Sequence, residues 1–193
     1  MKVGARLVLA SASPRRRALL EEMGLRFEVV PSEVDESLPS GSEPGGIAEG
    51  LALRKARAVA EGLRDALVLG ADTLVVAGSR ILGKPRDRAE AREFLRLLSG
   101  TTHRVITGVA LLEAPDGEPG VGHEVTRVTM RSLAGAEIEA YLDSAEWEGK
   151  AGAYAIQESG DRFVVRLEGS RSNVVGLPVE LVRRLLLAKG WSA

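Results

Sequence analysis

The sequence contains no cysteine and only two histidines, His103 and His123. Without cysteine, the chain can form no disulfide framework, thiol nucleophile or thiolate metal site. The two histidines lack the spacing of metal ligands, so zinc hydrolysis and Ser-His-Asp chemistry have little support. The formal net charge of −1 argues against bulk nucleic-acid binding, because such proteins are usually strongly basic. We therefore expect neither a zinc enzyme nor a nucleic-acid partner.

Long apolar runs and the common phosphate-binding loops are also missing. No run of about 18 apolar residues occurs, so no membrane span is expected. No N-terminal segment is typical of a signal peptide, which favours a cytoplasmic location. Neither a G-x-x-x-x-G-K-[ST] loop nor a G-x-G-x-x-G motif after a strand is present.

Short apolar runs alternate with segments of helical periodicity along the 193 residues. Ser13 and Asp87 are predicted to be helix N-caps. This alternation predicts an α/β fold with a long mixed twisted sheet flanked by helices, in a single domain over residues 1–193. The expected strands are residues 6–10, 27–30, 66–69, 74–77, 80–82, 104–113, 123–132 and 163–167, and the expected helices are residues 14–23, 47–63, 87–98, 136–144 and 178–189.

The stretch LASASPRRRALL places three arginines, residues 15–17, in the first turn of a helix that begins at Pro14. Cations are unfavourable there, because the unpaired N–H groups of a helix N-terminus already carry partial positive charge. One interpretation is that an anion such as phosphate binds at this turn. The alternative is a solvated helix end whose arginines pair with Glu21 and Glu22.

Asp72 stands in the almost wholly apolar stretch VLGADTLVV, where we expect one strand to end and another to begin. A carboxylate among buried residues costs several kcal/mol unless it is paired or bound to metal. Such a residue often serves as a metal ligand or general base. The alternative is an Asp that caps a turn through its own backbone, with the help of Thr73.

Two rare residue types supply further candidates, since the chain has five lysines and one glutamine. Lys55 lies in a predicted helix and Lys84 follows a predicted strand, although either could be a plain surface lysine. Gln157 ends the segment KAGAYAIQ, whose small residues would let the backbone approach a flat ligand, with Tyr154 available for packing. The Gln157 amide could read a base edge, and the alternative is a glycine-rich turn with a structural glutamine.

Eight segments together resemble one family. LASASPRRRALLEEMG, VDES, LALRKARAVA, LGADTLVV, ILGKPRD, LSGTTHRVITGVAL, KAGAYAIQ and GSRSNVVGLP occur in the order and spacing of the Maf family of nucleoside triphosphate pyrophosphatases, once named for septum-formation inhibition. The resemblance covers residues 9–178. It implies a Maf/ITPase-like fold with two lobes around a central cleft, and hydrolysis of a nucleoside triphosphate to the monophosphate and pyrophosphate.

The resemblance also implies roles for individual residues. The family has a glutamate in the segment after the second strand. It aligns best with Glu36 here, and neighbouring Asp35 is the alternative. At the selectivity positions the chain is similar to the branch that acts on dTTP and UTP, whereas the 7-methyl-GTP branch typically has tryptophan in place of Arg15. The implied catalytic residues are Asp72, Lys55, Lys84 and Glu36, and the implied substrate-binding and specificity residues are Ser11, Ser13, Arg15, Arg16, Thr73 and Gln157.

The family mechanism implies a divalent cation, Mg²⁺ or Mn²⁺, held by Asp72 and Glu36. The expected partner is a nucleotide substrate, and a homodimer is possible. Two residues depart from the family pattern and could alter the pocket: Glu158 stands where glycine is usual, and Arg171 where an aromatic is common. The alternative functions are the same reaction on purine or modified nucleotides, and a nucleotide-binding regulator of cell division without turnover.

Overall fold

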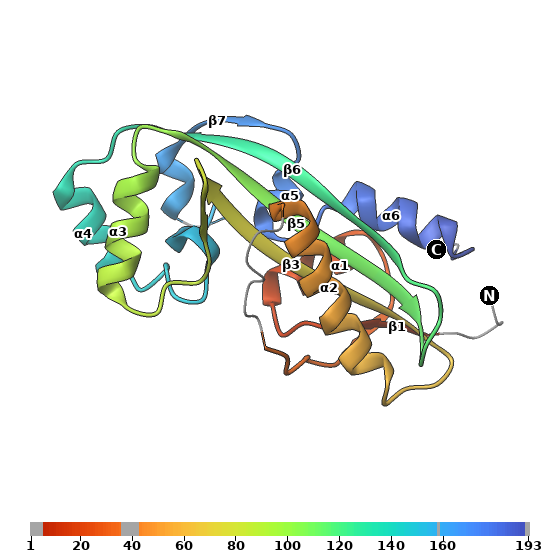
Figure 1. Cartoon of the computed structure of the whole chain (residues 1–193). Helices are drawn as coiled ribbons and strands as arrows, with labels where there is room; N and C mark the ends of the chain where they lie inside the picture. The colour runs from red at the N-terminus through yellow and green to blue at the C-terminus, as the bar shows by residue number, and fades with distance from the viewer. Residues whose placement is uncertain (1–5, 36–42, 158, 192–193) are drawn as a thin grey trace. The chain divides into compact units, whose positions relative to one another are not determined.

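The computed structural model describes residues 6–35, 43–157 and 159–191 of the chain, and within them it shows a mixed α/β fold (Figure 1). Seven strands form one sheet in the order β2-β1-β3-β5-β6-β7, with β4 paired to β3. The strands are β1 (Arg6–Leu9), β2 (Phe27–Val29), β3 (Ala66–Ala77), β4 (Arg80–Leu82), β5 (Thr102–Glu113), β6 (Gly120–Met130) and β7 (Val164–Glu168). The helices are α1 (Pro14–Glu22), α2 (Pro44–Ala60), α3 (Arg88–Leu98), α4 (Gly135–Asp143), α5 (Arg171–Val175) and α6 (Val179–Ala188), with short 3-10 turns η1 (Ala151–Ala153) and η2 (Ser159–Phe163).

The chain divides into two compact units, in agreement with the two lobes that the family resemblance implies. The first unit comprises Met1–Asp72, Thr107–Glu124 and Gly176–Ala193, and the second comprises Thr73–Ile106 and Val125–Val175. The strands β3, β5 and β6 each contribute residues to both units. The expectation of a single domain over residues 1–193 stays a prediction.

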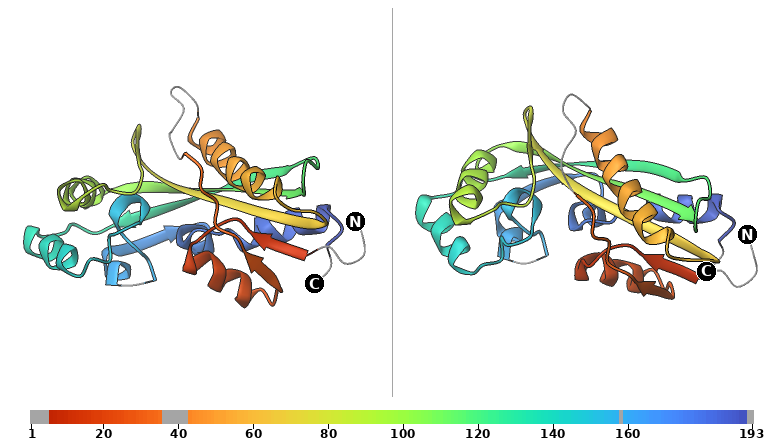
Figure 2. Two further views of the ribbon diagram at one scale, coloured as in Figure 1. Left: turned by 90° about the horizontal axis from the view of Figure 1, so that it is seen from below. Right: turned by 60° about the horizontal axis from the view of Figure 1, so that its bottom comes forward.

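In the first unit, β1 lies between β2 and β3 and runs parallel to both. The helix α2 lies along one face of this sheet (Figure 2). A Cβ atom added to Gly70 on β3 would lie 2.2 Å from the Ala52 carbonyl oxygen, and one on Gly108 of β5 would lie 2.2 Å from the Ala48 carbonyl carbon. Glycine on the strands and alanine on the helix thus let the two backbones approach directly. This close packing sets which α2 side chains reach β3.

The second unit has its own hydrophobic core, to which α3, α4 and the loop before β7 contribute. Within it, the rings of Tyr141 and Phe163 meet edge to face, with centroids 5.1 Å apart. Asp87 caps α3 as predicted, because its side chain accepts a hydrogen bond from the Glu90 amide at 2.8 Å. The strand β4 pairs antiparallel with β3, and β7 pairs antiparallel with β6.

The described structure differs from the expected elements at one strand break and at one helix. Residues 70–73 do not interrupt the strand, since β3 runs without a break from Ala66 to Ala77. Gly70 serves the close approach of α2 and makes no turn. The helix α5 was not expected either, because its five residues are too few to show helical periodicity. Among the described helices, none has the length and apolar character needed to span a membrane.

Candidate functional site

A buried ion pair joins α2 to β3 in the first unit. Lys55 and Asp72 are each only 6% exposed, and the Lys55 Nζ donates to Asp72 Oδ1 at 2.6 Å. The pair excludes two of the alternatives considered for these residues. Lys55 is not a surface lysine, and Asp72 lies inside a strand instead of capping a turn.

The position of this pair follows from the packing of α2. Alanines at 48, 52, 56 and 60 form a stripe along the helix and are buried. Lys55 is adjacent to this stripe on the helix surface, so its side chain also points toward the sheet. A carboxylate without a partner at the position of Asp72 would be costly, and the lysine offsets that cost by charge and hydrogen bonding.

The helix α1 follows the carboxyl end of β1, the strand that pairs with the first half of β3. The parallel pairing of β1 with β3 aligns Leu9 with Leu69, and the Ala10 amide donates to the Leu69 carbonyl at 2.8 Å. The chain therefore enters residues 11–17, the serine-arginine turn, beside the part of β3 that leads to Asp72. The carboxyl ends of parallel strands are where α/β proteins commonly place ligands.

The serines of this turn are held by hydrogen bonds. Ser13 is the N-cap of α1, and its hydroxyl accepts from the Arg16 amide at 3.4 Å. Ser11 is buried, and its hydroxyl accepts from the Ser13 amide at 3.3 Å and from Arg16 Nη1 at 3.1 Å. The turn is thus a fixed structure at a helix N-terminus, the type of structure that binds anions.

The three arginines of the turn have different partners. Arg17 forms an exposed ion pair with Glu21 at 2.8 Å. Arg16 bridges the turn to the rest of the first unit, because its Nε donates to the Gly176 carbonyl at 2.8 Å. Arg15 is half-buried and has no hydrogen bond or ion pair with any other described residue. The surface-pairing alternative is therefore right for Arg17, and Arg15 is left available to an anion.

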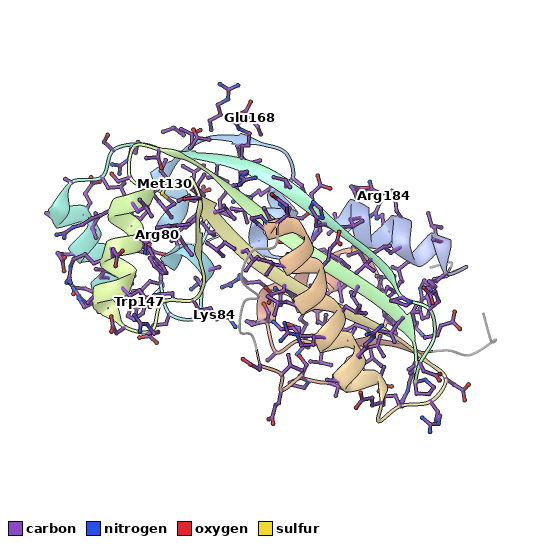
Figure 3. All side chains as sticks on the ribbon, viewed as in Figure 1. Arg80, Lys84, Met130, Trp147, Glu168 and Arg184 are labelled. Carbon is purple, nitrogen blue, oxygen red and sulfur yellow. The ribbon has the colours of Figure 1, made fainter. Side chains whose placement is uncertain are left out.

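The other candidates, Thr73, Lys84 and Gln157, belong to the second unit. Lys84 is exposed and its side chain projects from the segment after β4 (Figure 3). Gln157 is also exposed and makes no hydrogen bond within the described part of the chain. The segments that carry these residues are in contact, since the Gly152 amide donates to the Gly83 carbonyl at 3.0 Å.

Gly152 is the point where these segments meet, and the sequence analysis did not single it out. Its φ is +70°, and an added Cβ would lie 2.9 Å from Cγ2 of Val75 on β3. The glycine thus packs against the strand two residues beyond Thr73. The small residues of KAGAYAIQ were expected to admit a flat ligand, whereas at Gly152 they admit the side chain of Val75.

Gly152→Ala is therefore expected to destabilise the protein, because it adds both left-handed strain and overpacking. We expect a loss of about 2 to 4 kcal/mol in the free energy of unfolding. Denaturant titration would measure it, with Gly149→Ala as control. Gly149 also has positive φ, at +66°, but has no atom within 4 Å of an added Cβ. Equal losses in the two variants would show that packing against Val75 contributes nothing.

Tyr154 is buried and does not face a ligand, contrary to the expectation that it is available for packing against one. Its hydroxyl lies 2.8 Å from His103 Nε2 on β5. Burial lowers the pKa of His103 to about 4 and raises the pKa of Tyr154 above its usual range. Both groups are therefore neutral near pH 7, and their hydrogen bond ties the loop before Gln157 to the sheet.

Asn173 is fully buried in α5. Its Nδ2 donates to the Val105 carbonyl at 3.0 Å and to the Thr126 hydroxyl at 2.8 Å. Its role is therefore structural, since it fixes α5 to β5 and β6.

The predicted metal site can be tested only in part, because Glu36 lies outside the described residues. Its competitor Asp35 is exposed, and the Asp35 carbonyl accepts from Arg54 at 2.9 Å. No group of three acidic or histidine side chains suited to a metal occurs among the residues that the structure describes. Mg²⁺ is usually held by one or two carboxylates together with substrate phosphates. Asp72 is thus compatible with a cation that binds with the substrate.

Comparisons with known proteins identify the family of the chain. The family model described as Maf-like protein matches residues 6–189. A "dTTP/UTP pyrophosphatase" of Moorella thermoacetica is 54% identical over 96% of each chain. A second, from Pelotomaculum thermopropionicum, is 50% identical over 96% of this chain and 97% of that relative. Among solved structures, a HAM1 protein from Coxiella burnetii has a TM-score of 0.51 at 20% identity, over 96% of this chain and 99% of its own, which supports the fold alone.

Proposed function

The chain belongs to the Maf family, and from this membership we propose that it hydrolyses dTTP and UTP to the nucleoside monophosphate and pyrophosphate. The relatives that carry this activity in their names match it over nearly the whole chain. The observation that supports the proposal most is the buried Lys55–Asp72 pair. Its aspartate lies on β3, and β3 pairs with β1, the strand that leads into the serine-arginine turn. A protein that only bound phosphate would gain little from a carboxylate there.

In the proposed reaction, water attacks the α-phosphorus of the substrate. A P–O bond forms to the water oxygen, the bond to the bridging oxygen between the α- and β-phosphorus breaks, and pyrophosphate leaves. Asp72 orients the water and accepts its proton. Lys55 holds Asp72 in place by the hydrogen bond to Oδ1.

The triphosphate carries several negative charges and needs cationic partners. We assign this role to Arg15 and to the N-terminus of α1, which offers unpaired N–H groups. Arg16 shapes the turn through its bonds to Ser11 and Gly176. Lys84 is the further phosphate contact that the family resemblance implies.

Mg²⁺ or Mn²⁺ bound by Asp72, together with Glu36, would supply charge neutralisation on the phosphate oxygens. This assignment rests on the family and on the compatibility of Asp72. An activity assay with and without added Mg²⁺ would test it.

Base selection is assigned to Arg15, Thr73 and Gln157. The Gln157 amide offers one acceptor and one donor edge, which match the N3–H and a carbonyl of uracil or thymine. A flipped amide would instead match cytosine, so CTP belongs among the nucleotides to be compared.

The experiment that tests the function is a pyrophosphate-release screen over all canonical and several modified triphosphates. We expect the highest kcat/KM for dTTP and UTP. A preference for a purine or modified nucleotide would favour the alternative substrate class. Binding of UTP without any pyrophosphate release in the presence of metal would favour the regulator.

Gln157→Glu is expected to lower kcat/KM for UTP and dTTP by about tenfold or more, because a carboxylate cannot donate to the base carbonyl. Purine triphosphates should lose less. Ser79→Glu, at the exposed turn between β3 and β4, adds the same charge and serves as control. Equal losses across all nucleotides would identify Gln157 as a structural residue.

A cytoplasmic location, the absence of nucleic-acid partners and a homodimeric assembly stay predictions. Native mass spectrometry would establish the assembly.

A further inference from the structure

We propose that Arg171 is a positioning residue for base recognition, which acts by fixing the backbone next to Gln157. This inference rests on the proposed function, since it assumes that Gln157 contacts the base. It concerns residues of the second unit alone.

The first observation is the contact itself. Arg171 Nη2 donates to the Ile156 carbonyl at 3.0 Å, and this carbonyl belongs to the peptide bond that leads into Gln157. The Ile156 side chain is buried, whereas the Gln157 side chain is exposed and has no hydrogen bond to the rest of the described chain. The arginine therefore holds the main chain where it turns outward and leaves the glutamine amide available for a ligand.

The loop is also tied on both sides of this peptide bond. Before it, the Tyr154 hydroxyl meets His103 Nε2 at 2.8 Å. After it, Glu146 Oε2 accepts from the Ser159 amide at 3.0 Å and from the Ser159 hydroxyl at 2.6 Å. Between these two ties, Arg171 supplies a further side-chain hydrogen bond to the backbone. Its loss would give the backbone at Gln157 freedom that the other ties do not remove.

Arg171 can fix a backbone only if its own position is fixed, and the structure provides for this. The buried Asn173 anchors α5 through Val105 and Thr126. The Ser170 amide donates to the same Thr126 hydroxyl at 3.1 Å. At its other end, the guanidinium is steadied by Asp161, at 3.3 Å from Nη1. The residue is thus held at both the backbone and the head group.

Preorganisation of this kind affects binding rather than folding. A glutamine whose backbone is fixed loses less freedom when it pairs with a base, so the complex is tighter. The benefit exists only for ligands that have a base and only while Gln157 is present. Those two conditions separate a positioning role from a general structural role.

The test uses two probes and isothermal titration calorimetry on the full chain. The probes are α,β-methylene-UTP, which cannot be cleaved between the α- and β-phosphorus, and tripolyphosphate, which has no base. Arg171→Met keeps much of the side-chain length and removes the hydrogen-bond donors. Arg166→Met is the matched control, because Arg166 is an exposed arginine that pairs with Glu168 at 2.9 Å and belongs to β7.

We expect Arg171→Met to weaken binding of α,β-methylene-UTP roughly fivefold, because the freed segment must then be ordered on binding, and to leave tripolyphosphate binding unchanged. In a Gln157→Ala background the same change should have no effect on α,β-methylene-UTP, because the two residues act as a unit. Arg166→Met should change neither affinity. In turnover, KM for UTP should rise in Arg171→Met while kcat stays close to wild type.

Three results would overturn the inference: an equal loss for both probes, an undiminished loss in the Gln157→Ala background, or no loss at all. Failure of the wild-type chain to bind α,β-methylene-UTP would overturn it as well. A wild-type chain that shows the expected coupling in binding but releases no pyrophosphate from UTP would contradict the proposed function and leave the role of Arg171 supported.

Discussion

Asp72→Asn is expected to reduce pyrophosphate release from UTP by a factor of about a thousand, because the amide cannot accept the proton of the attacking water. The amide has nearly the shape of the carboxyl group, and its oxygen can still accept the hydrogen bond that Lys55 Nζ donates at 2.6 Å in the wild type. Affinity for UTP should therefore be largely kept. Steady-state kinetics and calorimetric titration with UTP would measure the two effects separately.

Asp65→Asn provides the matched control. Asp65 is exposed, immediately precedes β3 and has a φ of +52°, a conformation that asparagine tolerates well. The Asp65→Asn variant loses the same charge as Asp72→Asn, but outside the buried ion pair. Its pyrophosphatase activity should therefore stay near wild type. Turnover by Asp72→Asn at a rate comparable to that of Asp65→Asn would show that Asp72 is not the catalytic acceptor.

Lys55→Met is expected to have the largest effect on stability. It removes the partner of a carboxylate that is only 6% exposed. An uncompensated buried charge costs about 3 to 5 kcal/mol, which should appear as a lower free energy of unfolding in urea titrations. Arg57→Met, at an exposed position of the same helix, should cost far less.

The double variant Lys55→Met, Asp72→Leu separates stability from function. Replacement of a buried ion pair by apolar side chains is often neutral or stabilising, so this variant should recover most of the loss. It should have no pyrophosphatase activity. Activity in the double variant would show that the pair has no catalytic role. A Lys55→Met protein as stable as wild type would show that the pair does not have the energetic role assigned to it.

Local patterns were enough to predict most of the elements, the helix caps and the burial of Asp72. Ser13 and Asp87 can be predicted as helix N-caps from their own residue types and their immediate neighbours, and the structure confirms both. The unusual basic first turn of α1 indicates an anion site, which stays a prediction, and Arg15 has no partner among the described residues. The isolated carboxylate in an apolar strand correctly singled out Asp72 as a buried group.

The remainder depends on tertiary packing, which leaves little trace in a single sequence. In the sequence, Gly70 is typical of a residue that ends a strand. Only the helix packed against it shows that it permits close packing instead. Gly152 is one glycine among 22, and only its contact with Val75 shows why an alanine would not fit. Lys55 cannot be distinguished from a surface lysine on a helix, because its burial comes from the neighbouring alanine stripe.

Arg171 was noticeable only as a residue out of keeping with its family. Its partner is a main-chain carbonyl 15 residues away, and a carbonyl carries no sequence signal. The same is true of Glu146, which binds Ser159 across 13 residues. Contacts between a side chain and a distant backbone require the fold to be known first.

Isotope labelling tests the central claim, attack of water on the α-phosphorus, most directly. Hydrolysis of UTP by the wild-type chain in ¹⁸O-enriched water, followed by mass spectrometry of the products, locates the bond that forms. The account predicts one ¹⁸O atom in UMP and none in pyrophosphate. Label in pyrophosphate, or release of UDP and inorganic phosphate, would contradict it.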